Sequence, residues 1–186
     1  MPSVVDVVNR ALDKLGYGAI TSLGDGSKAA NLADRTWPIV RDQTLRDHPW
    51  NFAVERTILA PDSTTPSWGF TYRHPLPSNL LRLLEVRDLS SNEYQVEGRA
   101  ILSDEDTLYI RYIKQVTDPN QYDALFVDVS AARLAYELAE SLTQSNTKRE
   151  LAWNDYLDSL DRAKRADGQE NPPSVFEEDS WIEVRY

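Results

Sequence analysis

The feature that most constrains the fold is a change of hydrophobic period at His48-Pro49-Trp50. Before this point apolar residues recur at helical spacing, and after it they alternate as they do in strands. Five of the ten prolines lie between Pro49 and Pro77, where each would interrupt a long helix. The helical period returns after Asp118-Pro119. The sequence therefore predicts one helical unit that is interrupted by a β-rich insertion.

Two helices are predicted before the change of period. The first has Ser3 as its N-cap with Asp6 three residues on, and it ends at Gly16, which can adopt the left-handed conformation of a helix C-terminus. The second is capped by Ser27 and contains Pro38, which lacks a backbone donor. We expect Pro38 to kink this helix.

The insertion is predicted to contain five short strands. They are Phe52 to Leu59, Trp68 to Arg73, Leu81 to Arg87, Glu93 to Glu97, and Thr107 to Ile113. Their short lengths and turn-rich joints favour an antiparallel meander.

Two further helices are predicted after the insertion. The third begins at Pro119, placed where an early helical residue needs no amide donor, and it has a wide apolar face. The turn Gln144-Ser145-Asn146 leads into the fourth helix, whose inward residues are predicted to be Leu151, Tyr156, Leu157, Leu160 and Ala163.

The predicted fold class is α+β, mainly α. It is a four-helix bundle-like domain with an antiparallel β insertion between the second and third helices and an extended C-terminal arm. The helical domain comprises residues 1–48 and 118–166, the β-rich insertion residues 49–117, and the arm residues 167–186.

Composition excludes several classes of protein. The formal net charge is −10, from 30 acidic and 20 basic residues, and the basic residues are scattered. A freestanding nucleic-acid binder is disfavoured, because affinity for a polyanion depends on clustered Lys and Arg. The absence of cysteine excludes disulfides and thiolate metal sites. No run approaches the roughly 18 apolar residues of a membrane span, so no membrane association is expected.

The sequence contains no Walker loop, dinucleotide-binding glycine triplet, nucleophile elbow or HExxH helix. His48 and His74 are the only candidates for a neutral-pH general base, and both precede proline. Since neither has a nucleophile or orienting partner nearby in the sequence, they are interpreted as turn or packing residues. We expect no catalytic residue and no cofactor.

Two groups of carboxylates offer alternatives. Asp104, Glu105 and Asp106 could hold a divalent cation, but three adjacent acids point in different directions, so they are interpreted as a solvated hairpin tip and no metal is expected. Glu137 and Glu140 could form the paired carboxylates of a hydrolase, or a solvated stripe opposite the apolar face of the third helix.

The order of short motifs resembles one known family. Its most specific piece is His48-Pro49-Trp50-Asn51-Phe52-Ala53, in the setting of Arg41-Asp42. Further matching pieces are Asn9-Arg10-Ala11-Leu12 with Leu15-Gly16, Leu76-Pro77, Leu80-Leu81-Arg82, Tyr94 to Gly98, Leu108-Tyr109, and Arg133-Leu134-Ala135. This pattern resembles the tail tubular protein A family of short-tailed bacteriophages, over roughly Val4 to Ala166.

The resemblance implies a structural virion protein at the head–tail junction, made in the host cytoplasm and not an enzyme. It implies a dodecameric ring that joins the portal ring to a tail nozzle of the tail tubular protein B type and lets DNA pass through without specific binding. Phe176, Trp181 and Tyr186 of the arm are expected to contact a neighbouring subunit or nozzle protein. Asp155, Asp158 and Asp161 are candidates to line the channel. The alternatives are a head-completion connector of a long-tailed phage, a tail-associated cell-wall hydrolase and a small monomeric binding module.

Overall fold

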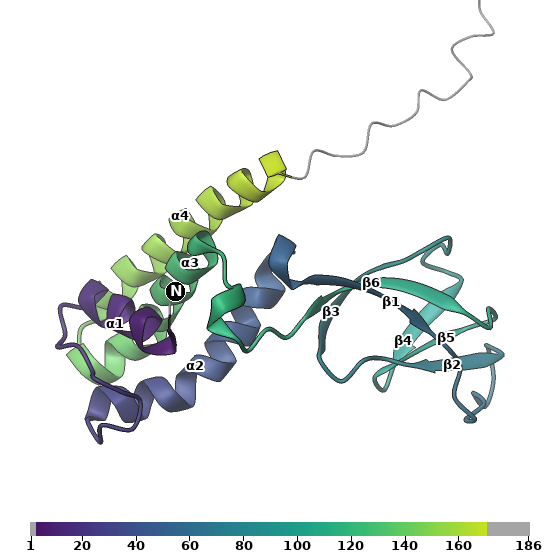
Figure 1. Cartoon of the computed structure of the whole chain (residues 1–186), viewed down its shortest axis with the longest axis horizontal. Helices are drawn as coiled ribbons and strands as arrows, with labels where there is room; N and C mark the ends of the chain where they lie inside the picture. The colour runs from purple at the N-terminus through teal and green to yellow at the C-terminus, as the bar shows by residue number, and fades with distance from the viewer. Residues whose placement is uncertain (1–2, 171–186) are drawn as a thin grey trace, which may run out of the picture.

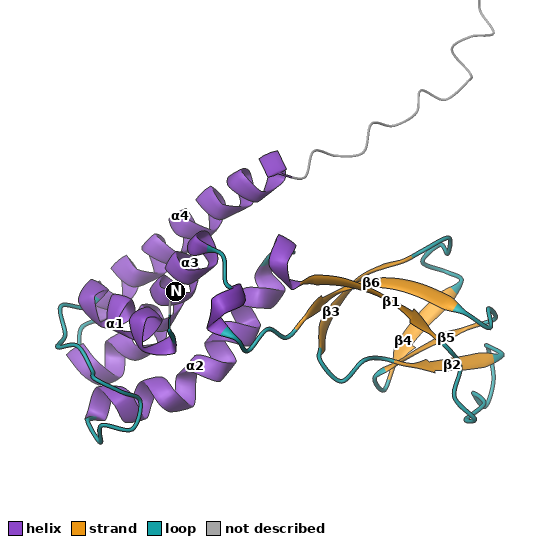
Figure 2. Cartoon of the chain, in the orientation of Figure 1, coloured by secondary structure: helices purple, strands orange, loops and turns teal. Residues whose placement is uncertain are grey.

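The computed structural model of the protein describes residues 3–170. Figure 1 shows an elongated molecule with a helical lobe at one end and a β lobe at the other, and Figure 2 shows how fully helix and strand are separated. The helical lobe contains α1 (Val4–Lys14), α2 (Lys28–Asp47), α3 (Ala124–Thr143) and α4 (Asn146–Glu170). All six described strands lie between α2 and α3, which makes the fold α+β. None of the helices within residues 3–170 is both long and apolar enough to span a membrane.

The ends of α1 follow the sequence prediction. Ser3 Oγ accepts a hydrogen bond from the Asp6 amide at 3.2 Å, and the Asp6 carboxylate accepts one from the Ser3 amide at 2.7 Å. This reciprocal capping box satisfies two amides that the first turn leaves free. At the other end Gly16 has a φ of +62°, a conformation that a side chain would strain. α1 is therefore delimited by its own local sequence.

α2 runs through Pro38 without a break in the helix. Figure 1 shows that its axis changes direction along its length. The buried face of α2 includes Ala29, Ala33, Trp37 and Leu45.

α3 is the centre of the helical lobe, because α1, α2 and α4 each pack against it. It begins at Ala124 with Asp123 as N-cap, whereas Pro119 belongs to a separate 3₁₀ turn, η2 (Pro119–Gln121). The prediction that Pro119 opens this helix was therefore wrong. The Asp123 carboxylate caps the true start at 2.7 Å from the Leu125 amide, as the dipole of a helix N-terminus favours.

α4 departs from the prediction in two ways. It continues to Glu170, so residues 167–170, assigned to the arm, are helical. Leu151 and Leu157, predicted to face inward, are 63% and 44% exposed, whereas Tyr156 is buried as predicted. The other inward predictions, Leu160 and Ala163, are also buried.

The strands form two small antiparallel sheets and not a meander. One sheet has the order β1 (Val54–Leu59), β6 (Leu108–Lys114), β3 (Leu80–Val86), and the other has the order β2 (Tyr72–Pro75), β5 (Ala100–Ser103), β4 (Tyr94–Glu97). Strand β5 was not predicted. It forms a hairpin with β4 through Gly98 and Arg99, both of which have positive φ, as a two-residue turn of this hand requires.

Strand β6 joins the two hydrophobic cores. Leu108, Ile110 and Tyr112 point into the core of the β lobe, whereas Ile113 on the opposite face belongs to the core of the helical lobe. Trp50, beside the start of β1, is 2% exposed, and its ring lies edge-on to Phe126 of α3 with centroids 5.2 Å apart. Trp50 is therefore a core anchor at the point where helix is followed by strand.

Candidate functional site

The three acids predicted to line a channel all lie on α4 but differ in their surroundings. Asp155 forms a 2.5 Å ion pair with Lys14 of α1 and is partly buried. Asp158 is exposed. Asp161 is also exposed and pairs with Arg165 one turn on, at 2.5 Å. Asp155 therefore ties α4 to α1, and Asp158 and Asp161 lie on the open surface of the helix.

The aromatic residues predicted to contact a partner, Phe176, Trp181 and Tyr186, lie outside the described residues. The described residues end at Glu170, close to a contact that holds the end of α4. Asp167 Oδ2 lies 2.7 Å from His48 Nε2, so the last turn of α4 is held beside the end of α2.

The two histidines lie in different elements, His48 at the end of α2 and His74 in β2. His48 contacts Asp167, and its ring is edge-on to Trp50 with centroids 5.0 Å apart. His74 is fully buried in β2, and neither of its ring nitrogens has a hydrogen-bond partner. Both environments are those of packing residues, because neither brings a nucleophile and an orienting group to the ring.

The two candidate carboxylate groups are engaged in local interactions. Asp104 Oδ1 accepts hydrogen bonds from the amide and hydroxyl of Thr71, at 2.9 and 2.8 Å. It lies where the chain passes from one sheet to the other, not at the tip of a hairpin, since β5 and β6 belong to different sheets. Over residues 3–170 no group of three or more potential ligands is arranged to hold a metal ion.

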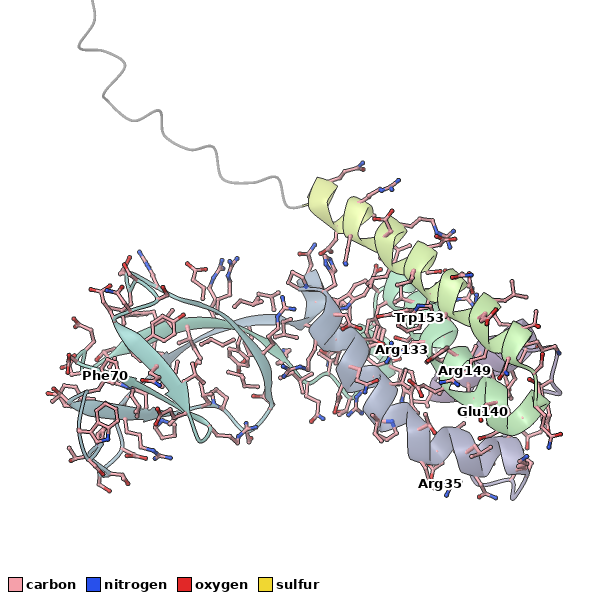
Figure 3. All side chains as sticks on the ribbon, turned by 180° about the vertical axis from the view of Figure 1, so that it is seen from behind. Arg35, Phe70, Arg133, Glu140, Arg149 and Trp153 are labelled. Atoms are coloured by element: carbon pink, nitrogen blue, oxygen red, sulfur yellow. The ribbon has the colours of Figure 1, made fainter. Side chains whose placement is uncertain are left out.

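Glu137 and Glu140 each pair with an arginine. Glu137 lies 3.4 Å from Arg133 on the same helix, and Glu140 lies 3.1 Å from Arg149 of α4. These arginines belong to a cluster that sequence reasoning did not predict, and Figure 3 labels three of its members, Arg133, Arg149 and Trp153, on α3 and α4. We call it the arginine–aromatic cluster; it consists of Arg133, Tyr136, Arg149, Trp153 and Tyr156.

Arg133 lies at the centre of the cluster. Its guanidinium carbon is 5.2 Å from the ring centroids of both Trp153 and Tyr156 and 5.8 Å from that of Tyr136. Its side chain is only 17% exposed. A cation over an aromatic face contributes about 0.5–2 kcal/mol, more where water is excluded. Arg133 therefore fixes α4 against α3.

Arg149 is the outer cation of the cluster. Its guanidinium carbon lies 4.9 Å from the Tyr136 ring centroid, and its Nη2 donates a 3.1 Å hydrogen bond to the Tyr136 hydroxyl. That hydrogen bond raises the pKa of the guanidinium above its usual value. Together with Trp153, Arg149 and Tyr136 line a shallow surface hollow that also includes Asn146, Glu150 and Asn154.

The inner end of the cluster is tied to α2. Tyr156 Oη donates a 2.5 Å hydrogen bond to Asp47 Oδ2, and burial together with this carboxylate raises the pKa of the phenol. The cluster therefore has a rigid, buried end at Tyr156 and an open end at Arg149. Rigid aromatic and arginine side chains are the types that dominate binding energy at protein interfaces.

One signal in the sequence could have revealed the cluster. On α3, Tyr136 and Glu137 lie three and four residues after Arg133, and Glu140 lies four and three residues after them. On α4, Arg149, Trp153 and Tyr156 recur at spacings of four and three. Each set lies on one helix face. Recognising the site required knowing that the two faces meet, which depends on how α3 and α4 pack.

Comparison with known proteins adds no assignment: neither the family models searched nor the curated proteins contain a match to this chain. The fold is α+β, and the candidate site is the arginine–aromatic cluster between α3 and α4.

Proposed function

We propose that the protein is a structural ring subunit of a tailed bacteriophage, the head-to-tail adaptor that joins the portal ring to the tail. In this role it forms a dodecameric ring with copies of itself, binds a tail nozzle protein and lets DNA pass. Its helical lobe acts as a four-helix bundle in the ring wall, and its C-terminal arm extends to a partner. The motif order around His48 to Ala53 supports this assignment.

The single structural observation that carries the proposal is that exposed apolar side chains lie on two different helices of the helical lobe; we call the parts of α2 and α4 that carry them the two apolar surfaces. α2 exposes Ile39 to 59%, and α4 exposes Leu151 and Leu157 to 63% and 44%. Both helices pack on α3, and Figure 1 shows them on different sides of the lobe. Head-to-tail contacts between copies in a ring need two unlike surfaces that fit each other, whereas a two-fold dimer uses one surface twice.

The charge of the chain explains why such a ring would need a template. At −10 per subunit, like-charged copies repel, and the exposed apolar residues are few. We expect the free subunit to be monomeric or weakly associated and to close into a ring on its portal. The subunit would then be in the host cytoplasm before assembly and at the head–tail junction of the virion afterwards.

The test is the mass of the subunit, measured by light scattering with and without its cognate portal ring. The expected result is a complex whose mass gain matches a closed ring of subunits. The adaptor proposal is wrong if the mass of the portal ring does not change on addition of subunit.

Three variants test whether the two apolar surfaces make the ring. Ile39→Glu on α2 and Leu157→Glu on α4 each place a charge in a proposed contact, and both should reduce ring formation on the portal. Thr65→Glu adds the same charge to an exposed loop of the β lobe and is the matched control. Equal loss in all three would indicate a general charge effect and not the two proposed surfaces.

Further measurements distinguish the alternatives. A head-completion connector of a long-tailed phage would also increase the mass of the portal ring, but it would not bind a nozzle protein. A tail-associated hydrolase would degrade cell-wall polymer and lose that activity in Glu137→Gln or Glu140→Gln, although both carboxylates are paired with arginine.

A further inference from the structure

One face of the β1-β6-β3 sheet carries an unusual set of exposed residues. In the register of β1 and β6, Arg56 lies opposite Arg111, and Ile58 lies opposite Tyr109. Ile58 is 60% exposed and Tyr109 is 48% exposed. With Arg87 these residues line a surface hollow, which we call the outer sheet face.

The charges of the outer sheet face are incompletely balanced. Arg111 pairs with Glu85 at 2.9 Å, and Arg87 pairs with its neighbour Asp88 at 3.3 Å. Arg56 has no ion-pair partner among residues 3–170. Like charges directly opposite each other in a sheet are destabilising, and an exposed isoleucine–tyrosine pair beside them is apolar surface left open to water. This face has the chemistry to hold an acidic segment that also carries large apolar side chains.

The outer sheet face continues directly into the helical lobe. Side chains alternate along strands, so Val54 of β1 and Ile113 of β6 lie on the same face as Arg56 and Arg111. Ile113 is fully buried in the core of the helical lobe. The end of α4 is held at this boundary, because Asp167 contacts His48, which lies six residues before Val54. A chain that leaves α4 therefore starts beside this face.

Residues 171–186 have the complementary composition. Asn171 to Tyr186 contains Glu177, Glu178, Asp179 and Glu183 against a single Arg185, together with Phe176, Trp181, Ile182, Val184 and Tyr186. The sixteen residues can span about 50 Å, whereas Ile58 lies at most about 35 Å of chain from His48. The segment is long enough to reach the face of its own chain.

We propose that residues 171–186 dock on the outer sheet face of the same chain, with their carboxylates on Arg56 and Arg111 and their apolar side chains on Ile58 and Tyr109. The tether through α4 gives the segment a high local concentration at this face. The proposal does not depend on the adaptor function. In an assembled ring a partner surface would have to displace the segment before its aromatic residues could bind elsewhere.

The test is limited proteolysis of the full chain with chymotrypsin, with products identified by mass spectrometry. Cleavage after Phe176 and Trp181 reports on access to the segment, and cleavage after Trp68, which is 84% exposed on a β-lobe loop, is an internal reference. Docking should slow cleavage after Phe176 about tenfold relative to the free synthetic peptide 171–186, because cleavage tracks the population of the undocked state. Equal rates in the chain and the peptide would overturn the proposal.

Variants locate the protection on this face. Arg56→Glu should restore fast cleavage after Phe176, whereas Arg35→Glu, the same change at an exposed position of α2 in the other lobe (Figure 3), should not. Reversing the segment with Glu177→Lys and Glu178→Lys should also expose it. Combining these two changes with Arg56→Glu should restore protection, a rescue that simple loss of fold could not produce.

Concentration distinguishes docking within one chain from docking between copies. Protection should be the same at all protein concentrations. Protection that grows with concentration would place the segment on a second copy and would contradict the proposal, and protection unaffected by Arg56→Glu would place it on another surface.

Discussion

His48 Nε2 lies 2.7 Å from Asp167 Oδ2 and joins the end of α2 to the last turns of α4, 119 residues further along the chain. The two side chains are 12% and 17% exposed, so this contact is shielded from solvent far more than the surface pairs of α4. It lies where the helical lobe meets the β lobe. Its loss would release the end of α4 from the junction between the lobes.

We predict that His48→Ala lowers the free energy of unfolding by about 1–3 kcal/mol, because it leaves a largely buried carboxylate without its partner and removes the edge-on contact with Trp50. Urea denaturation followed by circular dichroism measures this change. Arg165→Ala, which breaks the exposed pair with Asp161, is the control and should cost no more than about 1 kcal/mol. Equal losses in the two variants would show that the His48 contact has no special role.

At His74 we predict that a substitution raises the free energy of unfolding. Its ring is fully buried and both nitrogens lack a hydrogen-bond partner. Since a buried unsatisfied polar group costs about 1–3 kcal/mol, His74→Leu should raise the free energy of unfolding by about 1 kcal/mol. The same urea measurement checks it. A lower stability of His74→Leu would mean that the imidazole makes a favourable contact inside the β lobe.

The response to alkaline pH follows from three buried phenols, those of Tyr112, Tyr122 and Tyr156, and the pKa of each is raised. Burial raises the pKa of Tyr112 to about 12 and that of Tyr122 to about 12. These values lie above the ordinary tyrosine pKa of 10.0, so the associated stability is complete below pH 10 and is lost as the pH rises toward 12.

We therefore predict that the urea midpoint falls between pH 10 and 12 and that Tyr122→Phe falls less steeply than the unaltered protein. Absorbance at about 295 nm, where tyrosinate absorbs, should show three phenols, those of Tyr112, Tyr122 and Tyr156, that ionise only as the protein unfolds. Tyr17→Phe, which changes an exposed residue, is the control variant. Equal slopes in all three proteins would contradict the prediction.

The sequence predicted the helices well because their ends are determined locally. The Ser3 and Asp6 capping box and the Ser27 cap each satisfy amides of the adjacent turn. The outward position of Leu151 and Leu157 was not predictable in the same way. α4 buries the small residues Ala152 and Ser159 against α3, whose buried face contains Ala131, Ala132, Ala135 and Ala139, and small residues on both helices allow close packing that hydropathy alone does not indicate.

The pairing of strands and the arginine–aromatic cluster were not predictable for a related reason. Strand order depends on which of several short strands meet, and here β6 lies between β1 and β3 while β5 lies between β2 and β4. The turn between β4 and β5 has Arg99 in a left-handed conformation, where Gly or Asn is the usual signal. The cluster forms only where a face of α3 meets a face of α4.

The open end of that cluster provides a prediction about assembly. Arg149→Ala removes the outer guanidinium without touching Arg133, which fixes α4 against α3. We expect helical circular dichroism to be unchanged and binding to the portal or nozzle to weaken about tenfold or more, as is common for a central arginine at an interface. Lys28→Ala, at the start of α2, is the charge-matched control. Unchanged assembly of Arg149→Ala would limit the cluster to a structural role.

The last prediction concerns DNA. A channel wall rich in Lys and Arg would hold phosphates by counterion release, with an affinity that falls steeply as salt rises, whereas an acidic wall would let the duplex slide. We expect no measurable duplex binding by the free subunit at physiological salt.

Of the three candidate acids, Asp155 is bound to Lys14, so replacing it would disturb the contact between α1 and α4. The informative variant therefore reverses only Asp158→Lys and Asp161→Lys, which are exposed. It should form rings on the portal normally and should slow DNA ejection in vitro, most strongly at low salt. Asp13→Lys with Asp34→Lys, which reverses two exposed charges on α1 and α2, is the control. If well-formed particles of the two variants eject DNA at the same rate, Asp158 and Asp161 do not line the channel; tight, salt-sensitive duplex binding by the unaltered subunit would exclude an acidic channel altogether.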